Sequence, residues 1–173
     1  MKHRVRLIVL FIILTTPTVL VYSQGEKKPR TLEDYIPRTL QQLSVLQPSY
    51  IATEPSHKDA SIIVHADLLP TRVKVIYSGE KRPLNDRKKT VIVSWANRLA
   101  GAPEFYITPY DAEMLFTENG ENYWLVQRKE FVTQFEQELK KGDTVELFLI
   151  KMGNIRIDDK LEPVILVEKF LKP

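Results

Sequence analysis

The residues whose types and spacing suggest a binding site are cations that gather between positions 72 and 89. They are Arg72, Lys74, Arg82, Arg87, Lys88 and Lys89. Residues 79–90 follow one predicted strand and precede another, so we expect them to form a basic inter-strand loop. Arginine and lysine bind carboxylates and phosphates through charge and directed hydrogen bonds. The segment predicts a site for a protein partner or an anionic ligand; the alternative is a solvated loop that serves only solubility.

An acidic segment follows the basic one. Residues 99–122 contain Glu104, Asp111, Glu113, Glu118 and Glu121 and no lysine or arginine. Because the two regions carry opposite charge, the protein would be dipolar, and an anionic partner would be steered towards residues 79–90.

Groups that could carry out catalysis are scarce. After residue 23 the only histidines are His57 and His65, and the chain has no cysteine, which excludes thiol chemistry and cysteine-bound zinc. Neither a Gly-x-Ser-x-Gly turn nor a glycine-rich phosphate loop occurs. Asp158, Asp159 and Glu162 lack the alternating oxygen ligands of a calcium loop and are interpreted as part of a solvated turn. We therefore expect no catalytic residue, no metal and no cofactor.

An enzyme is the alternative that the sequence leaves open. It would be a secreted hydrolase or nuclease, in which Arg82 or Arg87 would bind the substrate phosphate beside acidic metal ligands. The basic segment offers few acids for that purpose, chiefly Asp86. A non-enzymatic binding or adaptor module is therefore the favoured prediction.

The first 23 residues are typical of a cleavable signal peptide. Lys2, Arg4 and Arg6 precede an uncharged apolar run over residues 7–22, and Ser23 favours cleavage before Gln24. The alternative is an uncleaved anchor, since the run is only slightly shorter than a membrane-spanning helix. We expect export to a bacterial periplasm or beyond and no membrane span after cleavage.

Removing this signal changes the charge of the protein. The chain has 25 Lys plus Arg and 22 Asp plus Glu, so loss of the three signal cations leaves 22 against 22. This neutral balance makes nucleic acid an unlikely partner, and an envelope protein or an anionic ligand is expected instead. The absence of cysteine and of Asn-x-Ser/Thr sites is consistent with a bacterial exported protein.

Residues 24–60 are predicted to form a flexible N-terminus and a short helical arm. Thr31 and Asp34 have the spacing of a capping box, and Pro37 suits the first position of a helix. Leu40, Leu43 and Leu46 would share one face of that helix. Packing on the chain's own domain is the favoured interpretation of this stripe, and binding of a partner is the alternative.

Residues 61–173 are predicted to form mostly strands. The Asn119-Gly120 pair predicts a tight hairpin, and apolar residues every four positions predict an amphipathic helix over residues 129–141. Tyr77 and Trp95 are predicted to lie in the core, whereas one of Tyr123 and Trp124 must face outward. Strands are expected at 61–66, 72–77, 90–96, 114–116, 123–126, 145–150 and 164–170.

This order of elements predicts a mainly β protein. It favours a small antiparallel OB-like Greek-key barrel with one amphipathic helix between strands three and four, plus the N-terminal helical arm. An SH3-like barrel or a β-sandwich is the alternative, because the strand at 61–66 is additional to the minimal OB pattern.

Overall fold

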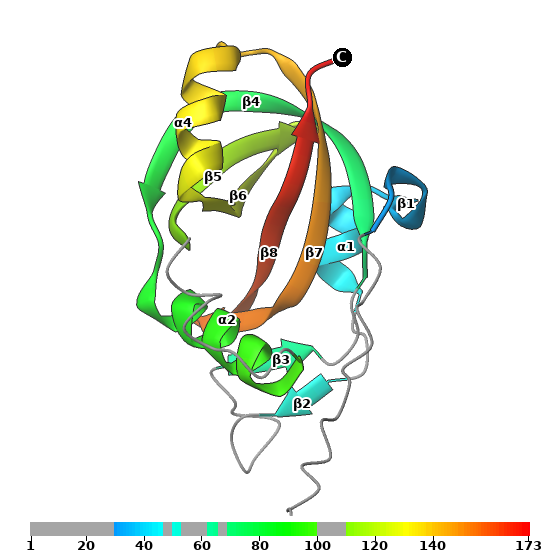
Figure 1. The fold of residues 1–173 in the computed structure, drawn as a ribbon. Coiled ribbons are helices and arrows are strands. Elements are labelled where there is room, and N and C mark those ends of the chain that lie inside the picture. Colours follow the sequence, from blue (N-terminus) through cyan, green and yellow to red (C-terminus); the bar gives the residue numbers. More distant parts are fainter. Residues whose placement is uncertain (1–29, 47–49, 53–61, 66–68, 100–109) are drawn as a thin grey trace, which may run out of the picture.

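The computed structural model describes residues 30–46, 50–52, 62–65, 69–99 and 110–173 (Figure 1). The predicted signal segment and His57 lie outside these residues. The described chain is mainly β, as predicted, and its strands form an eight-stranded mixed sheet that curves around a central core. No helix among the described residues has the length and apolar character needed to cross a membrane.

The long strands make up the body of the sheet. They are β4 (Thr71–Pro83), β5 (Tyr110–Glu118), β6 (Glu121–Arg128), β7 (Thr144–Ile157) and β8 (Lys160–Leu171). Strand β4 pairs antiparallel with β5 along one part of its length and with β7 along another. The β5–β6 and β7–β8 pairs are antiparallel hairpins, and β6 meets β8 in parallel at Val126 and Leu166.

Short strands extend the two ends of this sheet. Strand β1 (Ile36–Pro37) pairs in parallel with β4, and β3 (Ile62–His65) pairs with β7. Strand β2 (Tyr50–Ala52) pairs in turn with β3. The strand predicted at 61–66 is therefore present as β3.

Tight turns join both long hairpins. Asn119 and Gly120 have φ values of 52° and 84°, which confirms the predicted turn between β5 and β6. Asp158 and Asp159 adopt φ values of 46° and 62° between β7 and β8. The strand predicted at 145–150 is longer than expected, because β7 continues past residue 150 to Ile157.

The strand predicted at 90–96 is also wrong. These residues belong to helix α2 (Asp86–Leu99), whose first turn is capped by Asn85 Oδ1 accepting the Arg87 N–H at 2.8 Å. The buried apolar residues of α2 are Val91, Ile92, Trp95 and Ala96, which form a helical stripe. Alternating β-branched residues favoured a strand locally, but packing of this stripe on the sheet decides the conformation. Trp95 is buried as predicted, although on a helix.

Helix α4 (Lys129–Glu138) confirms the predicted amphipathic helix and ends slightly earlier than expected. It lies across the upper end of the curved sheet in Figure 1. Phe135 is fully buried on its inner face and stacks on Phe170, with ring centroids 4.2 Å apart. The aromatic contacts between α4 and β8 close this end of the core.

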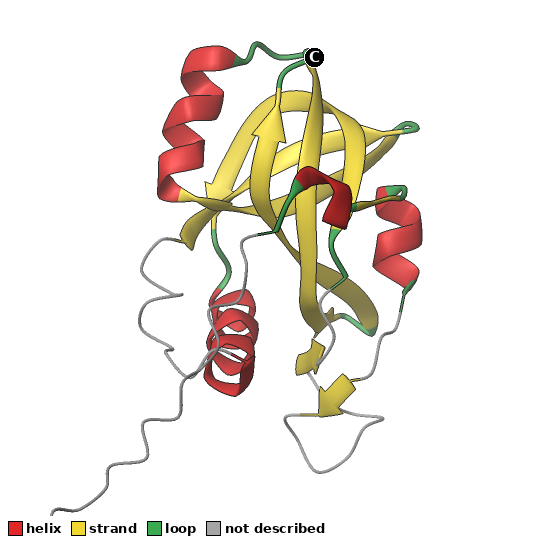
Figure 2. Cartoon of the chain, turned by 45° about the vertical axis from the view of Figure 1, so that its right-hand side comes forward, coloured by secondary structure: helices red, strands yellow, loops and turns green. Residues whose placement is uncertain are grey.

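The N-terminal arm packs on the sheet (Figure 2). It contains a 3-10 turn (η1, Leu32–Asp34) and helix α1 (Leu40–Val45). Pro37 lies in β1, so its predicted place in the helix is wrong; Thr39 caps α1 instead by accepting the Gln42 N–H at 3.0 Å. Leu40 and Leu43 have no exposed surface and belong to the main core cluster, so the leucine stripe packs on its own domain.

Two apolar clusters stabilise the fold. The first is formed by side chains of α1, α4 and the strands β4–β8, and it includes Tyr77, which is buried as predicted. The second lies between α2, β3 and the adjoining parts of β5, β6, β7 and β8, and it includes Trp95. The second cluster fixes α2 against the sheet and thereby positions the side chains of its first turn.

A buried lysine fastens α1 to the sheet. Lys151, on β7, has no exposed surface, and its Nζ donates to the carbonyl oxygens of Ser44 and Leu46 at 2.7 Å each. Burial lowers the pKa of Lys151 from 10.5 to about 8.

Lys151 is expected to make stability depend on pH. Between pH 8 and 10.5 the folded chain has lost the Lys151 proton while the unfolded chain retains it, so stability rises with pH in this window. The gain is expected to be at most about 3 kcal/mol. Urea unfolding of the wild type and Lys151→Met at pH 7, 9 and 10.5 measures it. Parallel pH profiles for the two proteins would contradict the assignment.

Candidate functional site

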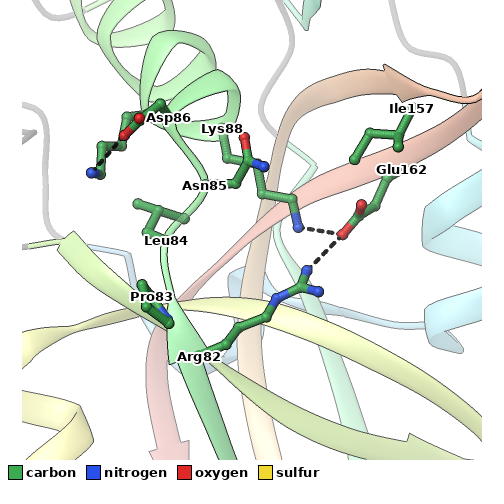
Figure 3. Close-up of a pocket in the computed structure, with 9 residues that line it drawn as sticks. Arg82, Pro83, Leu84, Asn85, Asp86, Lys88, Ile157 and Glu162 are labelled. Atoms are coloured by element: carbon green, nitrogen blue, oxygen red, sulfur yellow. Dashed lines mark hydrogen bonds and ion pairs between the residues drawn. The ribbon is translucent and has the colours of Figure 1, made fainter.

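Four charged side chains form one ion-pair cluster where β4, α2, β5 and β8 meet. Figure 3 shows three of them, Arg82, Lys88 and Glu162. Arg82 Nε lies 2.9 Å from Glu113 Oε2, and Arg82 Nη2 lies 2.9 Å from Glu162 Oε1. Lys88 Nζ lies 2.6 Å from the same Glu162 oxygen and also pairs with Glu113 Oε1. Each cation therefore bridges the same two carboxylates.

The secondary structure explains how these four groups meet. Arg82 and Glu113 lie directly opposite each other in the β4–β5 ladder, so their side chains share a face. Lys88 lies in the first turn of α2, and the packing of that helix brings it above the same face. Glu162 follows the β7–β8 turn and reaches the cluster from β8.

The cluster is buried on one side and open on the other. Lys88 and Glu113 have 0% exposed surface, whereas the side chains of Arg82 and Glu162 are 37% and 31% exposed. Burial raises the pKa of Glu162, but hydrogen bonds and charge from Lys88 and Arg82 outweigh this effect and lower it overall. The inner pair is structural, and the outer pair faces the surface.

Two hollows adjoin the outer pair, and Arg82 and Glu162 line both. The larger hollow, of about 490 Å³, lies beside the start of α2 and is also lined by Asn85, Asp86 and Lys89. The smaller hollow, of about 260 Å³, lies between β6 and β8. Its remaining lining residues are Asn122, Tyr123, Trp124, Leu125, Pro163 and Ile165.

Arg82 also contacts an aromatic ring. Its guanidinium carbon lies 4.3 Å from the centre of the Trp124 ring, in a cation–π arrangement. Tyr123, the neighbouring residue, packs against the first core cluster. Trp124 is thus the member of the pair that faces the candidate site.

The predicted basic loop is wrong as a structural element. Residues 79–83 belong to β4, and α2 begins at Asp86. Lys88 is buried in the cluster. Arg87 and Lys89 lie nearer the surface, where Arg87 Nη1 donates to the Arg156 carbonyl oxygen at 3.0 Å and Lys89 pairs with Asp86 at 2.9 Å.

The remaining predicted cations lie at the other end of β4. Arg72 and Lys74 are exposed and face away from the core, opposite Phe148 and Glu146 of β7. Arg82 lies beyond the irregularity in the β4–β5 ladder after Tyr77. The structure therefore brings Arg82 and Lys88 together but does not place Arg72 and Lys74 with them.

Sequence reasoning missed the acidic half of the site and the role of Trp124. Glu113 was predicted to lie in an acidic segment separate from the basic one, but it lies on β5 directly before the apolar run of residues 114–116. Glu162 was assigned to the solvated turn. The pairing of both acids with Arg82 depends on strand register, and no local sequence motif predicts that register.

These features define a mainly β protein with a surface site built on a buried ion-pair cluster. Neither the known protein-family models nor the curated protein sequences contain a match to this chain. Within the described residues, no group of three or more His, Asp or Glu side chains could hold a metal ion.

Proposed function

We propose that the protein is an extracytoplasmic, non-enzymatic binding module on an OB-like barrel, and that it recognises a protein partner. In this proposal the partner contacts the surface formed by Arg82, Trp124 and Glu162 with the two hollows beside them, which we call the groove. The export signal expected in residues 1–23 supports the extracytoplasmic location.

The pairing order of the strands supports an OB-like barrel. Taken in turn, β4 pairs with β5, β5 with β6, β6 with β8, β8 with β7, and β7 with β4 again. This is the order expected of a five-stranded Greek-key barrel, and α4 lies between its third and fourth strands. The antiparallel hairpins and the parallel β6–β8 contact agree with the same topology.

The position of the groove is the observation that carries the proposal. OB barrels bind ligands on the face of strands two and three and between the loops that join strands one to two and four to five. Here those strands are β5 and β6, and the loops are the α2 connection and the Asp158-Asp159 turn. Both hollows lie in this region, because Trp124 is on β6, Asn85 precedes α2, and Ile157 and Glu162 flank the turn.

The chemistry of the groove favours a protein over a polyanion. Lys88 and Arg82 are balanced by Glu113 and Glu162, so the cluster adds no net positive charge. Recognition would then depend on shape, hydrogen bonds and aromatic contact. Arginine and tryptophan are among the residues enriched at the centres of protein interfaces, and both line the smaller hollow.

Affinity capture with matched variants tests this function. The mature chain is immobilised, exposed to an envelope extract of its own cells, and the retained proteins are identified by mass spectrometry. Trp124→Ala is expected to reduce retention of the specific partner at least tenfold, because central aromatic anchors contribute about 2 kcal/mol or more. The control, Arg72→Ala with Lys74→Ala, should retain it as the wild type does.

The opposite pattern would contradict the proposal. If the Arg72→Ala/Lys74→Ala protein loses the partner and Trp124→Ala keeps it, the binding surface is the outer face of β4 and not the groove. Circular dichroism and the melting temperature of each variant establish that the fold is retained.

A further inference from the structure

We infer that the groove binds its partner by strand addition: an extended peptide segment pairs with the part of the β6 edge that does not pair with β8. This inference rests on the proposed function, because it names the chemical form of the partner in the same groove. The supporting observations are the register of two hairpins, the residues between them, and Arg82 Nη1, which donates to no described residue.

The register of the β5–β6 hairpin determines which backbone groups face away from β5. Glu118 and Glu121 flank the two-residue turn and form a hydrogen-bonded pair, and pairs along an antiparallel ladder alternate between bonded and non-bonded. Asn122, Trp124 and Val126 therefore occupy non-bonded positions. Their N–H and C=O groups are directed away from β5 and towards β8.

Only one of these three positions meets β8. Val126 pairs with Leu166, and the described residues contain no other pairing between β6 and β8. Asn122 and Trp124 thus form no pairing with β8, although their backbone N–H and C=O groups are directed towards it. Both residues line the smaller hollow, so this edge borders open space. Peptides bind to unpaired strand edges of this kind by strand addition.

The facing edge of β8 is blunted. In the β7–β8 ladder Pro163 lies opposite Asn154, two positions beyond the Arg156–Leu161 pair. The Arg156–Leu161 pair is non-bonded and the pairs alternate, so Pro163 is also at a non-bonded position. The side of Pro163 that faces β6 therefore lacks an N–H donor. Proline here disfavours direct closure of β6 onto β8, and the edge of β6 is left as the pairing surface for a peptide.

The side chains around the edge complement a particular kind of peptide. Trp124 and Pro163 make the smaller hollow suited to an apolar side chain. In the larger hollow the accessible cations are Arg82 and Lys89, because Lys88 is buried and paired with Glu113. Arg82 uses Nε and Nη2 in its ion pairs, and its Nη1 donates to no described residue. A carboxylate of the peptide would accept from that group, so the segment is expected to carry an acidic residue near an apolar one.

Peptide selection followed by backbone methylation tests strand addition on the wild-type protein. A phage-displayed library of random linear octapeptides is selected on the mature chain, and binding of synthetic copies is measured by Trp fluorescence and calorimetry. The expected sequences combine an acidic residue with a nearby apolar one. N-methylation at alternate positions should weaken binding about tenfold or more, and methylation at the positions between them should change it little.

A matched pair of protein variants tests the same edge from the other side. Asn122→Pro removes the N–H directed at β8 and leaves the β5 ladder intact, because that N–H does not bond to β5. Asn122→Ala removes the side chain, including its contact with Thr117 Oγ1 at 2.9 Å, and keeps the N–H. Asn122→Pro is expected to weaken binding about tenfold, and Asn122→Ala to bind like the wild type.

The outcomes separate this inference from the function on which it rests. If Trp124→Ala abolishes peptide binding while Asn122→Pro and every N-methylated peptide bind normally, the groove is the site but strand addition is wrong. If selected peptides bind and no groove variant affects them, the proposed site is wrong as well. If no peptide is selected while the envelope partner is still captured through Trp124, the inference fails and the function stands. The methylated peptides decide the matter even if Asn122→Pro does not fold.

Discussion

Replacing Lys88 with Met is expected to lower the free energy of unfolding by about 3 kcal/mol. The methionine fills a similar volume but removes a cation with no exposed surface, leaving the equally buried Glu113 with Arg82 as its remaining partner. A buried carboxylate that loses a partner bears an uncompensated desolvation cost. Urea unfolding at pH 7, analysed for midpoint and slope, measures the change.

Two further variants make this prediction specific. Lys89→Met, one residue along the same helix, removes an exposed ion pair with Asp86 and should cost less than about 1 kcal/mol. Lys88→Met combined with Glu113→Leu removes both buried charges and should be more stable than Lys88→Met alone. Equal losses for Lys88→Met and Lys89→Met would mean that the buried cluster does not stabilise the fold.

The second large effect is expected for Gly153→Ala, at about 3 kcal/mol. Gly153 lies on β7 where it pairs with β3. An added Cβ would lie 2.1 Å from the Ile63 carbonyl oxygen and 2.9 Å from Val91 Cγ1. The first of these neighbours is backbone, so β3 itself must move. Because Val91 belongs to α2, the packing that positions Lys88 is disturbed as well.

Hydrogen exchange locates this damage. Amides of β3 and α2 should lose protection in Gly153→Ala, while those of β4 and β5 in the first core cluster keep theirs. Gly120→Ala is the control, since its φ of 84° imposes backbone strain of about 1 kcal/mol but its added Cβ meets nothing within 4 Å. Unchanged exchange in β3 would show that β7 accommodates the methyl group without separating the strands.

The sequence of helix α2 fits both a strand and a helix. Val91, Val93 and Trp95 recur at alternate positions, and this pattern predicted a strand that is in fact a helix. Both periodicities are present, because Ile92 and Ala96 also complete a helical stripe. Local pattern could not choose between them, and the choice followed from the apolar surface of β3, β7 and β8 against which the helix packs.

Other elements could be predicted because their signals are local. The Asn-Gly turn depends on two residues that tolerate positive φ, and α4 depends on apolar residues spaced by one helical turn. The leucines of α1 show the same spacing, and their burial follows from it. Each of these features is decided within about ten neighbouring residues, where sequence pattern is informative.

The cations between positions 72 and 89 show most clearly which features of the site could not be predicted from the sequence. By itself the sequence determined that Arg82 and Lys88 are charged, lie near one another and have acids elsewhere in the chain. Only the tertiary structure decided that these cations are paired with Glu113 and Glu162, that Arg72 and Lys74 lie elsewhere, and that Trp124 stands beside Arg82. The physical reason is that a charge interacts with whatever the fold places within a few ångströms, and strand register and helix packing set those distances.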